Sequence, residues 1–98
     1  MIDPKSCATI EELRVGIDAL DAELTRLMAL RAAFIDRASE LKPGKGIPAR
    51  VNDRVEEVAQ NARRNAEAVG WDPDLAERLW REMIEWSIAR EERVIGPS

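Results

Sequence analysis

Two basic side chains interrupt an apolar stripe in the first part of the sequence and could bind an anion. Arg31 and Lys42 fall on the face that carries this stripe, and Arg14 lies at its edge, since successive helical residues turn by about 100°. A buried cation without a counter-charge is very costly, so these positions predict an internal pocket for a small, multiply anionic ligand. The stripe repeats every three or four positions and consists of Leu13, Ile17, Leu20, Leu24, Leu27, Phe34, Ala38 and Leu41.

Each of these cations also has a simpler interpretation. A long basic side chain can lay its stem on the core and keep its charged end in water. We favour a binding site because Arg31 and Lys42 share one stripe, and because the fork of arginine suits carboxylates. Arg26 and Arg37 point to the opposite side and are expected to be ordinary surface charges.

Three more candidate residues lie on the two segments that follow. Ser87 falls on the apolar side of the last predicted helix, and Glu91, one turn later, shares its face. Arg54 flanks the apolar face of the middle helix. The simpler alternatives are a small core serine bonded to the preceding turn and an ordinary surface glutamate.

The first helix predicted to position these residues is unusually long. Thr9 and Glu12 form a capping box at its start, and the helical pattern continues to Lys42, where Pro43-Gly44 ends it. At 1.5 Å per residue, such a helix is roughly 50 Å long.

Two shorter helices complete the prediction. One covers Val51 to Ala68 with Gly70 as C-terminal cap, and the other follows the cap Asp72 with Pro73 in its first position and reaches Val94. No segment alternates as a strand does, so the predicted class is all-α. The expected apolar face of the middle helix is Val51, Val55, Val58, Ala62 and Val69, and that of the last helix is Leu75, Leu79, Met83, Ser87 and Val94.

One chain of this shape cannot cover the first helix. The near-heptad spacing of its stripe requires a partner helix, and bare apolar surface on this scale is unfavourable. We therefore expect a helical bundle formed by an intertwined homodimer. A non-catalytic helical dimerisation module remains the simpler alternative.

Composition narrows the classes of function. The 98 residues are expected to form one domain, spanning 1–98, with a net charge of −4, which disfavours a nucleic-acid partner. There is no histidine and only one cysteine, so we expect no metal site and no disulfide within the chain. The sequence shows no apolar signal region and no run of membrane-spanning length, and a cytoplasmic protein without a membrane partner is expected.

The candidate residues also follow a known order. The run from Arg14 to Asp21 is Arg-Val-Gly-Ile-Asp-Ala-Leu-Asp, and it is followed at fixed intervals by Leu24, Leu27, Arg31, Lys42, Ile47-Pro48-Ala49, Arg54, Ser87 and Glu91. This series covers nearly the whole chain without a gap. It resembles the all-α class of chorismate mutases and their close relatives, the isochorismate pyruvate lyases.

The resemblance implies an intertwined homodimer of three-helix chains with two active sites and no cofactor. It implies that Arg14 crosses into the site of the partner. Arg31 and Arg54 match the residues that hold the carboxylates of a small dicarboxylate substrate, which is chorismate or isochorismate.

The resemblance also assigns the reacting end of the pocket. Lys42 matches the lysine that binds the ether oxygen and a carboxylate of the substrate. Glu91 takes the place of a second donor to that oxygen, usually a glutamine, and Ser87 matches a substrate-contacting position. Lys42, Glu91 and Arg31 are therefore the expected catalytic residues.

The implied activity is the pericyclic rearrangement of chorismate to prephenate, a step in aromatic amino acid biosynthesis. It needs no nucleophile, metal or general base, which agrees with a chain that lacks histidine. The alternative is the lyase, which eliminates pyruvate from isochorismate and leaves salicylate. Val51 and Val55 favour the alternative, because they replace two acidic residues with which mutases contact the ring hydroxyl.

Overall fold

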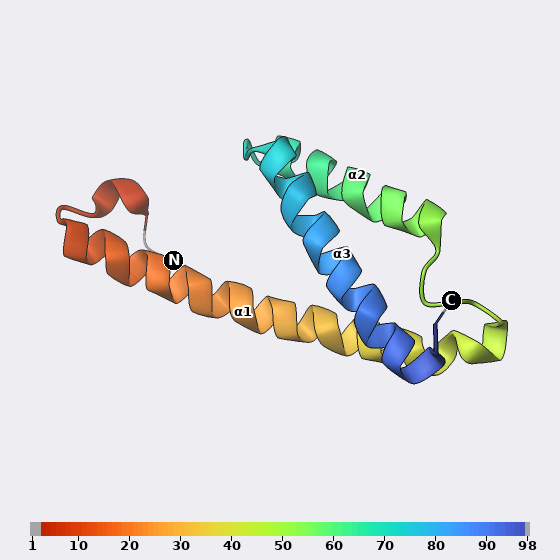
Figure 1. Cartoon of the computed structure of the whole chain (residues 1–98). Helices are drawn as coiled ribbons and strands as arrows, with labels where there is room; N and C mark the ends of the chain where they lie inside the picture. Colours follow the sequence, from red (N-terminus) through yellow and green to blue (C-terminus); the bar gives the residue numbers. More distant parts are fainter. Residues whose placement is uncertain (1–2, 98) are drawn as a thin grey trace. The chain divides into compact units, whose positions relative to one another are not determined.

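The computed structural model describes residues 3–97 and contains helices but no strand in that range. A short 3-10 turn, η1 (Pro4–Ser6), precedes α1 (Ile10–Leu41), and a second turn, η2 (Pro43–Lys45), leads to α2 (Asn52–Ala68) and α3 (Pro73–Ile95) (Figure 1). The predicted all-α class is confirmed, and each helix ends within one residue of its expected bounds.

Local capping accounts for these bounds. Thr9 Oγ1 accepts a hydrogen bond from the Glu12 amide at 3.1 Å, as in a capping box. In a regular capping box, the Glu12 carboxylate would accept from the amide of Thr9. Here it accepts instead from the amide of the preceding residue, Ala8, at 2.9 Å. At the start of α3, Asp72 Oδ1 accepts from the Asp74 amide at 3.0 Å.

The chain divides into two compact units, Met1–Ala33 and Phe34–Ser98, whose boundary lies inside α1. In the second unit, α2 and α3 pack against each other as a helical hairpin (Figure 1). Small side chains let the two helices approach closely. One cluster joins Ala49, Ala59, Ile84 and Ile88, and another joins Ala62, Ala66 and Ala76 with Trp80 packed against it.

The buried faces of α2 and α3 differ from the predicted ones. Val69, Leu79 and Val94 were expected on the apolar faces but are exposed. Val69 lies beyond the last residue of α2, in the turn. On α3, Ile84 and Ile88 are buried instead, because the helix carries apolar residues on two adjoining faces and its own chain covers only one.

The apolar stripe of α1 is not covered by the single chain. Ile17, Leu20, Leu24 and Leu27 are each between 42% and 54% exposed. Water therefore reaches a row of large apolar side chains, which is unfavourable unless another surface covers it. Among residues 3–97, none of the helices combines the length and the hydropathy required to cross a bilayer.

Candidate functional site

Lys42 and Glu91 form a shielded ion pair in the unit that starts at Phe34. Lys42 Nζ lies 2.8 Å from Glu91 Oε1, and only 21% of the lysine side chain and 5% of the glutamate side chain are exposed. The ammonium group also donates to the carbonyl oxygen of Ala49 at 3.0 Å. Lys42, which was predicted to point inward, therefore has an anionic partner within its own chain. The apolar stripe of α1 could not predict this partner, because Glu91 belongs to α3.

The backbone holds Lys42 at the point where α1 ends. Its amide donates to the Ala38 carbonyl at 2.8 Å, which continues the helical pattern by one residue. Its carbonyl accepts from the amides of Lys45 and Ile47, both at 3.0 Å. The turn after α1 is thus closed on Lys42, and both ends of this residue are fixed before a ligand arrives.

Glu91 is not an ordinary surface glutamate, which was the simpler alternative for this residue. It is buried on the face of α3 that also buries Ile84 and Ile88. Its Oε1 has no hydrogen-bond partner among the described residues, because the contact with Lys42 brings the charges together without the angles of a hydrogen bond. The buried carboxylate is therefore stabilised by the charge of Lys42 rather than by a well-directed hydrogen bond.

Ser87 is buried one turn before Glu91. Its hydroxyl donates to the Met83 carbonyl in the preceding turn at 2.8 Å, as the simpler interpretation of a small core serine predicts. The hydroxyl oxygen can still accept a hydrogen bond while it donates this one. Substrate contact by Ser87 stays a prediction.

The three arginines of the predicted site lie in different units of the chain. The exposed Arg54 forms an ion pair with Glu57 of the same helix. Arg14 is exposed and Arg31 is half-buried, and both belong to the unit that ends at Ala33. The roles expected for all three remain predictions.

The two arginines assigned to the surface lie there. Arg26 pairs with Glu23 and Arg37 pairs with Glu40, each at 2.6 Å and three residues apart along α1. More than half of each arginine side chain is exposed. The phase argument therefore separated Arg26 and Arg37 correctly from Lys42.

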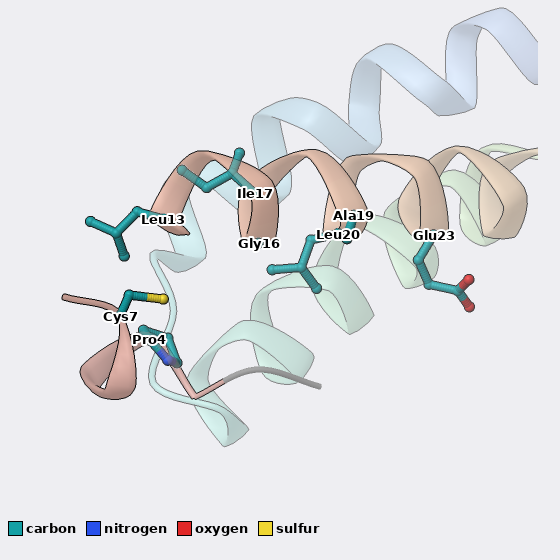
Figure 2. Close-up of a pocket in the computed structure, with 8 residues that line it drawn as sticks. All are labelled: Pro4, Cys7, Leu13, Gly16, Ile17, Ala19, Leu20 and Glu23. Atoms are coloured by element: carbon teal, nitrogen blue, oxygen red, sulfur yellow. The ribbon is translucent and has the colours of Figure 1, made fainter. Parts of the chain in front are cut away.

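A cavity of about 440 Å³ lies elsewhere, between η1 and the first turns of α1 (Figure 2). Glu23 is the one charged residue among the described residues that line it, so the cavity does not suit an anion. Part of the apolar stripe of α1 lines the cavity. Its lining residues are Pro4, Cys7, Leu13, Gly16, Ile17, Ala19, Leu20 and Glu23.

One polar contact near the site was missed by the sequence analysis. Arg90 binds Asp36 through two hydrogen bonds, Nε to Oδ1 at 2.5 Å and Nη2 to Oδ2 at 2.9 Å. The hydrogen bonds from Arg90 hold the pKa of Asp36 below its usual value. The residues stand 54 positions apart, so no spacing rule pairs them.

Comparison with known proteins identifies the family of the chain. A family model described as chorismate mutase type II matches residues 13–92, a range that includes every predicted site residue. The chain belongs to the chorismate mutase type II family. The all-α fold of this family is the fold found here.

The individual relatives carry names that describe different proteins. The T-protein of Enterobacter agglomerans is 33% identical over 84 residues, which are 86% of this chain but 22% of the relative. A bifunctional chorismate mutase/prephenate dehydratase of Aquifex aeolicus is 30% identical over 90% of this chain and 26% of its own length. The isochorismate pyruvate lyase of Pseudomonas aeruginosa is 29% identical over 93% of this chain and 89% of its own.

This chain therefore spans less than a third of the first and second of these relatives and most of the third. The family predicts an enzyme that acts on a chorismate-type substrate. The relatives do not agree on a single activity.

Proposed function

We propose that this protein is a chorismate mutase that rearranges chorismate to prephenate. The observation that carries the proposal is the shielded Lys42–Glu91 pair, which lies inside the range matched by the family. It joins a cation and a carboxyl group at the two positions where the family resemblance implies the donors to the ether oxygen.

The reaction needs positioning and charge stabilisation. The substrate must be held in its compact conformer so that one carbon–oxygen bond breaks while one carbon–carbon bond forms. Negative charge grows on the ether oxygen as the bond breaks, and a donor aimed at this oxygen stabilises the transition state more than the ground state. Lys42 Nζ supplies a charged donor, held by the Ala49 carbonyl at 3.0 Å.

Glu91 is the second donor in this proposal. A carboxyl group donates a hydrogen bond only when it is protonated. The substrate oxygen and a substrate carboxylate compete with Glu91 for Lys42. Arg31 and Arg54 bind the carboxylates of the substrate, and Ser87 contacts it one turn before Glu91.

A second copy of this chain completes the site and supplies Arg14. The support is the uncovered stripe of α1, whose large side chains are about half exposed in a single chain. The apolar cavity beside η1 adds to this surface (Figure 2). Burying such a stripe against its equivalent in a second copy is the economical way to remove it from water.

Mixed dimers test this arrangement. Arg14→Ala and Arg31→Ala homodimers should each be nearly inactive, because every site lacks one arginine. A hybrid of the two should regain one complete site and a large part of its activity. A stable, active monomer in sedimentation velocity would disprove the shared site.

Isochorismate pyruvate lyase is the second candidate, with salicylate and pyruvate as products. It is favoured by the similarity to the Pseudomonas aeruginosa lyase, which extends over 89% of that protein. It is also favoured by Val51 and Val55, because neither can accept a hydrogen bond from a ring hydroxyl. The two activities use the same cations. The mutase would place the protein in aromatic amino acid biosynthesis, and the lyase would place it in salicylate biosynthesis. In either case we expect one catalytic domain in the cytoplasm.

The purified protein given each substrate in turn distinguishes these functions. Prephenate formed from chorismate supports the mutase, and salicylate with an equal amount of pyruvate formed from isochorismate supports the lyase. If neither substrate is consumed or bound, the non-catalytic dimerisation module is the correct interpretation.

A further inference from the structure

A second polar contact links α1 to α3 beside the Lys42–Glu91 pair. Asp36 on α1 and Arg90 on α3 are held by the two hydrogen bonds described above, at 2.5 and 2.9 Å. The guanidinium carbon of Arg90 also lies 5.3 Å from the ring centre of Trp86, one turn earlier on α3, at a distance typical of a cation–π contact. Arg90 is thus fixed from two directions.

The two contacts start from adjacent residues of α3 and reach positions further apart on the other segment. Arg90 and Glu91 are consecutive on α3, whereas Asp36 and Lys42 are six residues apart, or roughly 9 Å along the helix axis. Ser39 lies midway between them, is 2% exposed, and satisfies its hydroxyl within α1 by donating to the Ile35 carbonyl at 3.2 Å. A small, buried and internally satisfied residue at this point indicates close packing on the side of α1 that carries Asp36 and Lys42.

We propose that Asp36 and Arg90 are positioning residues, whose bidentate contact fixes the end of α1 against α3 and so sets the separation of Lys42 and Glu91. A single contact between two helices lets them pivot about it, whereas two contacts at different heights prevent both pivoting and sliding. The catalytic consequence rests on the proposed function, because only then does the Lys42–Glu91 separation control a reaction.

The geometry distinguishes this contact from the other ion pairs on α1. The Arg37–Glu40 pair is just as short, at 2.6 Å, but both partners are on α1 and cannot hold α3. Asp36 and Arg90 join two helices, and the contact uses both carboxylate oxygens and two nitrogens on one edge of the guanidinium group. Such a planar, two-bond contact restricts orientation more than a single charge contact does.

Asp36→Asn tests the proposal, with Glu40→Gln as the matched control from the same end of α1. A displacement of about 1 Å at a reacting group can cost on the order of 10²-fold in rate, so we expect kcat for Asp36→Asn to fall by at least about tenfold. The control should keep the kcat of the wild type. Charge reversal by Asp36→Arg should be harmful, and adding Arg90→Asp should restore part of the lost rate.

A second readout does not depend on turnover. The carboxyl carbon resonance of Glu91, observed by NMR in unliganded protein, reports on its contact with Lys42. It should shift in Asp36→Asn and in Arg90→Met but not in Glu40→Gln, at temperatures where every variant is folded.

The two readouts separate the possible failures. If the wild type acts on neither chorismate nor isochorismate, the proposed function fails and the Glu91 resonance alone decides whether Asp36 positions the pair. If Asp36→Asn leaves both kcat and the Glu91 resonance as in the wild type, the positioning role is wrong. A general loss of stability without a shift of this resonance would equally contradict it.

Discussion

Removal of Lys42 should destabilise the fold, because it leaves the buried carboxylate of Glu91 without its counter-charge. The perturbation is Lys42→Met, which keeps most of the side-chain volume. At 2.8 Å and an effective dielectric constant of about 20, the attraction between the two charges is about 6 kcal/mol, part of which is offset by their desolvation. Breaking one side of such a pair costs about 3 kcal/mol, at the low end of the usual range because Lys42 keeps some contact with water.

Urea unfolding at equal protein concentration measures this cost. Glu91→Gln should lose less, about 1 kcal/mol, since Lys42 keeps the Ala49 carbonyl as an acceptor. Lys42→Met/Glu91→Gln should be more stable than Lys42→Met alone, because no buried charge remains. A Lys42→Met protein as stable as the wild type, or a double variant whose loss is the sum of the single losses, would refute the reasoning.

Three further predictions concern turnover and acid stability. Arg31→Ala should lower kcat/KM by on the order of 10²-fold, measured on chorismate, while Arg26→Ala from the opposite face should leave it unchanged. Glu91→Gln should keep or raise kcat/KM on chorismate, because the amide group of glutamine always carries a hydrogen-bond donor, and loss of activity in this variant would contradict the donor role. Hydrogen bonds from Arg81 and from a second arginine hold the pKa of Glu77 below its ordinary 4.5, so the stability it contributes is present above that pH and lost as pH falls through the lower, folded-state value. Glu77→Gln should therefore weaken the dependence of melting temperature on pH in the acid range, and an unchanged dependence would contradict this.

The parts of the fold that depend on local chemistry could be predicted from the sequence. Thr9 begins α1 and Asp72 begins α3 because a side-chain oxygen at each position accepts a backbone amide within three residues. The phase of Lys42 on the apolar stripe likewise follows from helical geometry alone, and the structure shields this side chain as expected.

The remaining features depend on which helices meet. Leu79 and Ile84 are both apolar residues of α3, but only Ile84 faces α2, and periodicity does not say which face the chain itself covers. The pairing of Lys42 with Glu91 could not be predicted either, because the two residues lie 49 positions apart, at the end of α1 and on α3. An inward lysine without a partner would cost stability, whereas the contact with Glu91 makes Lys42 stabilising.

The most direct test of the central claim is the rate of prephenate formation from chorismate by the wild type and by Lys42→Met, both below their unfolding temperatures. We predict measurable turnover by the wild type and a loss on the order of 10²-fold or more in the variant, since the charged donor to the ether oxygen is gone. Equal rates in the two proteins would show that the Lys42–Glu91 pair is not the catalytic centre.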